Sequence, residues 1–323
     1  MAPNSLAGKR YLITGGGGFI GSCLVRLLLG SGCETAVLEP TSAMPWRLAG
    51  ISEAFSLYAA DVTDSRATAD IMKQVRPDGV FHLAAYGVDS ADQDIHEAIR
   101  VNVSGMVSVL EAMRQTGCGR IVAMGSGAEY GSFEGAADEK TVLRPQSPYG
   151  STKAAATIIA HQWAAQHGIG LITLRPFGVY GEGEPRHKLF CHVILSLLDG
   201  QDVPLTPCGQ CRDYCHVADI AAAMAACMAK TSVSDQVFNV GTGELHPLKH
   251  YVERIRAIID SPGRVLYGAL PYRSNEVWAT APDIRRIRER IGWCPIISLQ
   301  QGLERTIDWF RANRHLYSAA PLS

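Results

Sequence analysis

A tyrosine and a lysine that stand four residues apart are the first candidates for chemistry in this sequence. They are Tyr149 and Lys153, in the stretch "SPYGSTKAAATII". Ser147 followed by Pro148 is typical of a helix start, so both side chains should lie on one helical face. An ammonium group near a phenol favours the phenolate and lowers the pKa of the phenol toward the range of a general acid or base. We therefore predict that Tyr149 transfers a proton and that Lys153 lowers the pKa of Tyr149.

A glycine-rich turn near the N-terminus is the second candidate. In "YLITGGGGFIGSCLVRLLL", Gly15, Gly18 and Gly21 have the spacing G-x-x-G-x-x-G between a predicted strand and a predicted helix. Glycines let the backbone approach a pyrophosphate, which the N–H groups of a helix start can bind. Glu39 ends the second predicted strand and can accept ribose hydroxyls while it repels a 2′-phosphate. These residues predict NAD as the cofactor, with NADP as the alternative because Arg47 follows closely.

Short apolar runs alternate with longer amphipathic ones in the first half of the chain. Strands are predicted at "RYLIT", "ETAVLE", "FSLYAAD", "GVFHLA", "RIVAMG" and "GLITLR", and helices near residues 19–30, 64–75, 94–116 and 148–167. This alternation predicts a Rossmann-type α/β fold, with a doubly wound parallel sheet buried on both faces. We expect an NAD-binding domain over residues 1–177, to which residues about 210–245 return, and a smaller interleaved substrate-binding region over residues 178–323.

The composition excludes several other classes of protein. The 323 residues carry a formal net charge of −1, which predicts no nucleic-acid partner and no anionic membrane surface. The sequence has no run of about eighteen apolar residues, and its N-terminus lacks the apolar core of a signal peptide. The nine cysteines are scattered and odd in number, as in a reduced protein. We therefore expect a cytoplasmic protein.

One cysteine cluster has a spacing that zinc sites use. "CGQCRDYCH" places Cys208, Cys211, Cys215 and His216 within nine residues, and Cys-x-x-Cys is a metal-ligand spacing. A second Cys-x-x-Cys pair does not follow, and the next residues, "VADIAAAM", read as a strand that turns into a helix. We therefore predict no metal, with zinc as the alternative.

Further motifs occur along nearly the whole chain. They are "TGGGGFIG", "FHLAA", "VNVSG", "GSGAEYG", "YGSTK", "LRPFGVYG", "RDYCHVADIA", "FNVGTGE" and "RIGWCP". With these motifs the sequence resembles the extended short-chain dehydrogenase/reductases, the family of nucleotide-sugar epimerases, dehydratases and reductases. The resemblance implies a nucleotide-diphosphate sugar as substrate. It also implies a homodimer, in which the helices near 94–116 and 148–167 pack into a four-helix interface.

The same resemblance assigns the catalytic roles. Tyr149 would move the proton of the sugar hydroxyl or carbonyl. Lys153 would lower the pKa of Tyr149 and bind the nicotinamide ribose. Ser126, in "GSGAEYG", would hydrogen-bond the same sugar oxygen.

The predicted binding residues follow from the same motifs. Asn102 resembles the family's helix asparagine that supports the lysine, and Asp61 is either an adenine contact or a surface carboxylate. Arg212 resembles the family's diphosphate-binding arginine, and Arg273 aligns loosely with a second one. The predicted cofactor-binding residues are Gly15, Gly18, Phe19, Ile20, Gly21, Glu39, Asp61, Val62, Asn102, Tyr149 and Lys153, and the predicted substrate-binding residues are Glu129, Arg212 and Arg273.

The residues after Ser126 narrow the reaction. The family's 4,6-dehydratases have an Asp-Glu pair there, whereas this chain has Gly127 and Ala128. Dehydration needs groups that take the C5 proton and protonate the leaving hydroxyl, so we exclude 4,6-dehydration. Hydride transfer with one proton remains, as in a 4-ketoreductase or a 4-epimerase.

Two glutamates favour different reactions. Glu129, directly before "YG", is similar to the glutamate of the family's 4-ketoreductases and would contact a substrate hydroxyl, or else be a loop carboxylate at the cleft rim. Glu39 favours retained NAD, which suits an epimerase. Gly178 replaces the family's usual asparagine, so an amide contact with the substrate is absent. We predict an NAD(H)-dependent nucleotide-sugar oxidoreductase that reduces C4 of a 4-keto-(6-deoxy)hexose. The alternatives are an NAD-dependent 4-epimerase and a non-catalytic dinucleotide-sensing protein.

Overall fold

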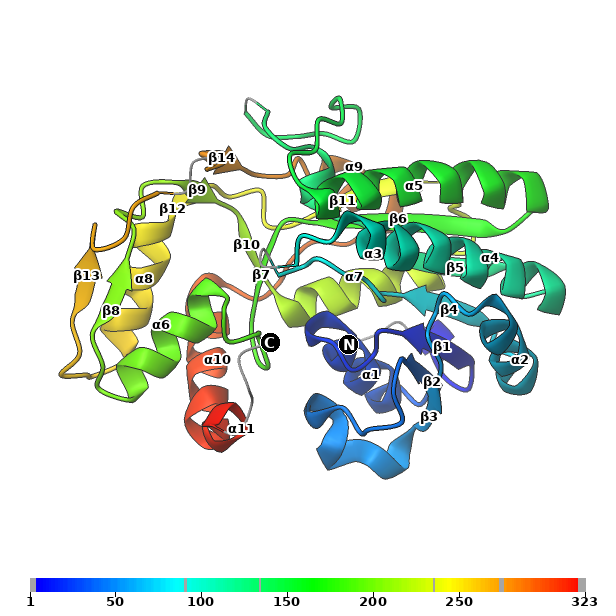
Figure 1. Ribbon diagram of the computed structural model, residues 1–323, viewed down its shortest axis with the longest axis horizontal. Helices are drawn as coiled ribbons and strands as arrows, with labels where there is room; N and C mark the ends of the chain where they lie inside the picture. Colours follow the sequence, from blue (N-terminus) through cyan, green and yellow to red (C-terminus); the bar gives the residue numbers. More distant parts are fainter. Residues whose placement is uncertain (1–3, 90–91, 134, 235, 273–275, 319–323) are drawn as a thin grey trace.

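Seven parallel strands form the central sheet of the protein (Figure 1). The computed structural model describes residues 4–89, 92–133, 135–234, 236–272 and 276–318. The strand order is β11-β6-β5-β4-β1-β2-β3, and each neighbouring pair is parallel. The strands are β1 (Arg10–Thr14), β2 (Glu34–Glu39), β3 (Ser56–Ala59), β4 (Gly79–His82), β5 (Arg120–Met124), β6 (Gly170–Pro176) and β11 (Gln236–Val240). The predicted Rossmann-type α/β fold is confirmed.

Helices cover both faces of this sheet (Figure 1). They are α1 (Phe19–Gly30), α2 (Ser65–Val75), α4 (Gly105–Thr116), α5 (Pro148–His167) and α7 (Val217–Ala229). Leu12 and Val80 pack with α2, α4 and α5, whereas their neighbours Ile13 and Phe81 pack with α1 and α7. Successive strand residues point to opposite faces, so a sheet covered on both sides needs strands that are apolar throughout. This is why the strand sequences do not alternate with polar residues.

The helix predicted near 94–116 is divided into three parts. It consists of α3 (Ile95–Ala98), the π-helical turn η3 (Ile99–Ser104) and α4. The prediction of one helix is therefore corrected. A π turn inside a helix adds a residue to one turn and often accompanies a functional side chain. Here the inserted turn contains Asn102.

The second half of the chain builds a separate apolar core around three helices, α6 (Leu189–Leu198), α8 (Leu248–Ile258) and α10 (Leu299–Asn313). Its short strands are β7 (Gly178–Tyr180), β8 (Val203–Leu205), β9 (Cys211–Arg212), β10 (Tyr214–His216), β12 (His246–Pro247), β13 (Val265–Tyr267) and β14 (Ala279–Thr280). The remaining elements are η1 (Asn4–Leu6), η2 (Trp46–Ala54), η4 (Gly127–Glu129), α9 (Arg285–Ile291) and α11 (His315–Ser318). Helix α7 packs on the seven-stranded sheet and β11 is one of its strands, so the chain crosses between the two cores more than once. The boundary at residue 177 stays a prediction.

None of the helices in the described residues is long and apolar enough to span a membrane.

Candidate active site

The glycine turn between β1 and α1 is closely packed. Gly15 has φ +70°, and a Cβ atom there would stand 2.7 Å from a backbone nitrogen of the loop after β4. A Cβ atom on Gly21 would lie 2.1 Å from the Gly15 carbonyl oxygen. Helix α1 begins with Phe19 and Ile20 after Gly18, and no side chain caps its first N–H groups. The close approach and these N–H groups fit the pyrophosphate of a dinucleotide.

Glu39, at the end of β2, lies against this turn. Its Oε1 accepts a hydrogen bond from the Gly17 N–H at 2.6 Å, and burial raises the pKa of its carboxyl group. Arg47, the residue that would favour NADP, donates from Nε to the Gly183 carbonyl oxygen at 2.8 Å. Its guanidinium carbon lies 4.2 Å from the centre of the Trp46 ring. A carboxylate beside the turn and an arginine engaged elsewhere both favour NAD.

We expect Glu39→Ala to weaken NAD binding and to narrow the preference for NAD over NADP. The substitution removes the charge that repels a 2′-phosphate and also the acceptor that holds the Gly17 N–H. Losing one charge-assisted hydrogen bond should raise the Kd for NAD by about tenfold or more, measured by titration with both cofactors. Glu34→Ala, at the exposed start of the same strand, is the matched control. A wild-type preference for NADP would contradict this interpretation.

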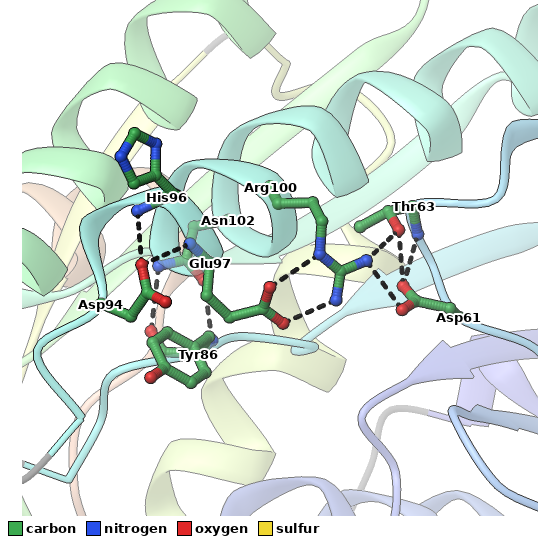
Figure 2. Close-up of polar contacts among 8 residues, drawn as sticks. All are labelled: Asp61, Thr63, Tyr86, Asp94, His96, Glu97, Arg100 and Asn102. Atoms are coloured by element: carbon green, nitrogen blue, oxygen red, sulfur yellow. Dashed lines mark hydrogen bonds and ion pairs between the residues drawn. The ribbon is translucent and has the colours of Figure 1, made fainter.

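Asp61 belongs to a polar network that includes part of the π turn (Figure 2). Its Oδ1 accepts hydrogen bonds from the N–H and hydroxyl of Thr63 at 2.9 and 2.8 Å. Its Oδ2 accepts one from Arg100 Nη1 at 2.8 Å, and Arg100 also pairs with Glu97. The Asp61 side chain is about half exposed, whereas Val62 is buried in the core beside it. An adenine contact by Asp61 stays a prediction.

Asn102 connects two parts of the site (Figure 2). Its Oδ1 accepts from the Tyr86 N–H at 2.8 Å, and its Nδ2 donates to the Tyr86 carbonyl oxygen at 3.0 Å. The same Nδ2 donates to Thr152 Oγ1 at 2.9 Å, on α5 directly before Lys153. Asn102 therefore holds the loop after β4 against the helix that carries the lysine. The predicted support of Lys153 by Asn102 stays a prediction, and Thr152 is the residue through which it would act.

The three residues predicted to be catalytic lie at the ends of two adjacent elements. Ser126 follows β5, and Tyr149 and Lys153 occupy the first two turns of α5. Ser147 caps this helix and a proline occupies its first turn, as the sequence predicted. A hydrogen bond joins Ser126 to Tyr149. Tyr149 keeps part of its surface exposed, whereas Lys153 is buried. A substrate oxygen can therefore reach a serine hydroxyl and a phenol together.

Burial dominates the protonation of this pair. It raises the pKa of Tyr149 to about 12; the hydrogen bond from Ser126 opposes this shift, and the charge of Glu129 adds to it. Burial also lowers the pKa of Lys153 to about 8, against the effect of Glu129. Desolvation favours the uncharged form of each group. The net pKa of Tyr149 is therefore raised where a lowering was expected, because desolvation is the largest cause. The contribution of Lys153 to the Tyr149 pKa stays a prediction. The phenol is protonated at neutral pH, which is the form that donates a proton.

Glu129 does not lie where the sequence placed it. Its side chain is 0% exposed, so the interpretations as a substrate contact and as a rim carboxylate are both wrong. Oε1 accepts the Ser126 N–H at 2.9 Å, and Oε2 accepts Arg175 Nε at 2.8 Å. The reason is Arg175, a buried cation at the end of β6 that needs a buried anion. An arginine inside the apolar run "GLITLRP" was the sequence signal that could have revealed this pair.

The predicted substrate-binding arginines are only partly described. Arg212 on β9 pairs with Glu276 at 2.8 Å and has its side chain largely buried. Arg273 lies outside the described residues. The departure at Gly178 has a packing reason, because a Cβ atom there would stand 2.3 Å from the Asp213 carbonyl oxygen. Strands β7 and β10 are paired too closely at this point for an asparagine.

The cysteine cluster has other contacts. Cys208 and Cys215 are buried and Cys211 is partly exposed. His216 caps α7 by accepting the Ala218 N–H on Nδ1 at 3.2 Å. Within the described ranges, no group of three or more His, Cys, Asp or Glu side chains is arranged to hold a metal ion.

The fold and this site fit an enzyme that binds a dinucleotide, and comparison with known proteins gives its family. Residues 11–241 match the NAD dependent epimerase/dehydratase family. The chain belongs to this family, and it is an extended short-chain dehydrogenase/reductase that depends on NAD.

Similar proteins of the family carry out two reactions. A dTDP-glucose 4,6-dehydratase of Streptomyces niveus is 30% identical over 94% of each chain. A UDP-glucose 4-epimerase of Streptomyces lividans is 31% identical over 90% of this chain and 92% of that protein.

Solved structures of both kinds of enzyme are also similar. A UDP-glucose 4-epimerase of Thermotoga maritima with UDP-glucose has a TM-score of 0.88, with 26% identity over 94% of this chain and 99% of that one. The DesIV dTDP-glucose 4,6-dehydratase of Streptomyces venezuelae, with NAD and TYD bound, has a TM-score of 0.85, with 26% identity over 95% and 98%.

Proposed function

We propose that the protein is an NAD(H)-dependent 4-ketoreductase of nucleotide-diphosphate 4-keto-(6-deoxy)hexoses. The observation that carries this proposal is the content of the site around Ser126. Tyr149 supplies one proton-transfer group, the two residues after Ser126 are small, and the Glu129 carboxylate is engaged in a buried ion pair. That set suits hydride transfer coupled to one proton and gives no second acid or base for an elimination.

The similarity to 4,6-dehydratases does not extend to the residues that dehydration needs. By the resemblance drawn from the sequence, Gly127 and Ala128 stand where 4,6-dehydratases carry an Asp-Glu pair. The Phe177 ring packs over Gly127, and a Cβ atom on this glycine would lie 3.1 Å from the ring. Any side chain at this position would require the ring to shift by a few tenths of an ångström. This packing supports a reaction without loss of water.

The proposed mechanism uses the geometry of three side chains. Tyr149 donates its proton to the C4 oxygen as the carbonyl becomes a hydroxyl, and Ser126 donates a hydrogen bond to the same oxygen. Lys153, one turn further along α5, stabilises the phenolate that remains. The bound dinucleotide supplies the hydride. We propose Arg212 and Arg273 as the contacts of the substrate diphosphate.

A 4-epimerase is the second candidate, favoured by the UDP-glucose 4-epimerase relatives. Cofactor stoichiometry separates the two reactions. A 4-ketoreductase should consume one equivalent of NADH per molecule of a 4-keto sugar such as dTDP-4-keto-6-deoxyglucose. An epimerase should convert UDP-glucose or dTDP-glucose to its C4 epimer with no net change in NADH. Epimerisation without added NADH would overturn the proposed reduction.

We also propose a homodimer formed through α5 and the π-interrupted helix. In the single chain, α5 exposes Ile158 and Ile159, and the neighbouring α3 and η3 expose Ile95 and Ile99. Isoleucines on two adjacent helices are typical of a subunit interface.

Light scattering at micromolar concentration should therefore give the mass of two chains. We expect Ile158→Asp to yield monomers, because a charge would be buried at the interface. Ile296→Asp, at an exposed residue on the other half of the chain, is the control and should stay dimeric. A monomeric wild-type protein would contradict this proposal.

A further inference from the structure

A chain of buried polar groups connects the catalytic serine with the edge of the sheet. Glu129 receives hydrogen bonds from the Ser126 N–H and from Arg175. Arg175 Nη1 donates to the Tyr130 hydroxyl at 3.0 Å, and this hydroxyl donates to Asn239 Oδ1 at 2.7 Å. The four residues beyond Ser126 are each less than 5% exposed. The network joins the ends of β5 and β6 to β11.

We propose that Glu129 is a positioning residue: its buried carboxylate, held by Arg175, fixes catalytic Ser126 and keeps a negative charge beside Tyr149 and Lys153. The proposal rests on the proton-transfer role proposed for Tyr149. It does not depend on whether the enzyme is a reductase or an epimerase.

The hydrogen bonds explain how Glu129 orients the serine. Glu129 and Ser126 form a reciprocal capping box at η4. Glu129 holds the Ser126 backbone N–H, and the Ala128 N–H donates to Ser126 Oγ at 3.1 Å. An acceptor site of the serine hydroxyl is therefore occupied by the backbone. Its hydrogen is left to donate toward Tyr149 or a substrate oxygen.

Stability alone gives a weak reason for this arrangement. Removing two charges from water is unfavourable, and a buried ion pair is often no more stable than an apolar pair of similar volume. Glu129 and Arg175 are both buried, and Arg175 also lies over the Tyr130 ring, 4.8 Å from its centre. What an apolar pair would not supply is an acceptor for the Ser126 N–H and a charge next to the catalytic helix.

The charge of Glu129 has a measurable consequence. Ser126 and Glu129, from the β5 side, act on the Tyr149 and Lys153 pair. His82, from β4, also faces this pair, and the Lys153 charge helps to lower its pKa. Burial lowers the pKa of His82 to about 3, so this histidine is neutral above acidic pH. The Glu129 charge raises the pKa of both Tyr149 and Lys153. Removing it should lower the Tyr149 pKa, so more of the phenol ionises at a given alkaline pH.

The first test needs no substrate. The ultraviolet absorbance of tyrosinate is titrated in the NAD complex of wild type and Glu129→Gln, up to the highest pH at which circular dichroism shows an intact fold. Subtracting the same titration of a Tyr149→Phe version isolates the Tyr149 signal. The proposal expects more ionised Tyr149 in Glu129→Gln than in wild type. If Tyr149 ionises equally or less in Glu129→Gln than in wild type, Glu129 does not act on Tyr149 through its charge, and that part of the proposal is overturned.

The second test is kinetic, with the substrate that the wild type turns over. Glu129→Gln should lower kcat by about ten- to a hundredfold with little change in KM, because Ser126 loses the charge-assisted hydrogen bond that orients it toward the reacting oxygen. Asp219→Asn is the matched control. Asp219 is also a buried carboxylate that accepts hydrogen bonds from backbone N–H groups, but its partners are Ile296 and Ile297, which are not part of this site. Asp219→Asn should lower thermal stability and leave kcat and the Tyr149 titration unchanged. An unchanged kcat in Glu129→Gln would overturn the positioning role.

A double variant separates positioning from folding. Glu129→Leu combined with Arg175→Met replaces the ion pair by apolar residues of similar size, which should preserve the fold. We expect a thermal midpoint near that of wild type and a kcat as low as that of Glu129→Gln. A stable double variant with wild-type kcat would show that Glu129 only neutralises Arg175. If the double variant does not fold, the Tyr149 titration and the kcat of Glu129→Gln decide whether Glu129 is a positioning residue.

Discussion

Replacing Tyr149 by phenylalanine should lower turnover by on the order of 10² to 10⁴, the usual contribution of general acid–base catalysis. The change removes the phenol hydroxyl, which Ser126 contacts, and keeps the ring that packs at the start of α5. NAD binding should stay close to that of wild type, because the glycine turn and Glu39 are untouched. Turnover and calorimetric NAD titration measure the two effects separately.

The matched control for this variant is Tyr58→Phe on β3, which removes a hydroxyl from a tyrosine away from Ser126. It should leave turnover unchanged. Near-normal turnover of Tyr149→Phe would show that another group transfers the proton. Loss of NAD binding in that variant would show that its effect is structural.

The second large effect is expected on stability. Arg175→Met leaves the Glu129 carboxylate buried without its cation, and breaking such a pair from one side destabilises a protein by about 3 to 5 kcal/mol. The side chains of the two residues are 5% and 0% exposed, so water cannot replace the lost partner. Urea or thermal unfolding measures the change.

An exposed ion pair provides the comparison. Arg311→Met breaks the pair with Asp308 on the surface of α10, where solvent compensates both charges. Its unfolding curve should overlay that of wild type. If Arg175→Met is as stable as Arg311→Met, the Glu129–Arg175 ion pair is not buried from solvent, and the expected loss of stability is contradicted.

Much of the fold could be predicted because each local signal agreed with the global one. The glycine turn, the alternation of strands and helices, and the Ser147 cap each depend on the nearest neighbours in the chain. They fixed β1, α1 and α5 almost to the residue. Ser126 and Tyr149 come together because Ser126 directly follows β5 and Tyr149 lies in the first turn of α5.

The parts that sequence could not predict depend on burial and on distant partners. Glu129 looked like a loop carboxylate, and only the position of Arg175, 46 residues away, turns it inward. The raised Tyr149 pKa could not be predicted, because a helical spacing shows where the lysine lies but not how far the phenol is desolvated. The π turn that contains Asn102 also depends on distant partners. The Asn102 side-chain amide forms hydrogen bonds with Tyr86, after β4, and with Thr152, on α5.

This site should transfer one hydride at C4 without eliminating water, and one isotope measurement tests this expectation. The enzyme is incubated with a 4-keto nucleotide sugar and NADH that carries deuterium at the transferable position, and the product is examined by mass spectrometry. A 4-ketoreductase should give a product with one deuterium at C4 for each NADH consumed. A 4,6-dehydratase should instead convert a plain nucleotide hexose in D₂O with solvent deuterium at C5, and an epimerase should take up none from added NADH. Deuterium at C4 is the predicted result, and either of the other patterns would contradict it.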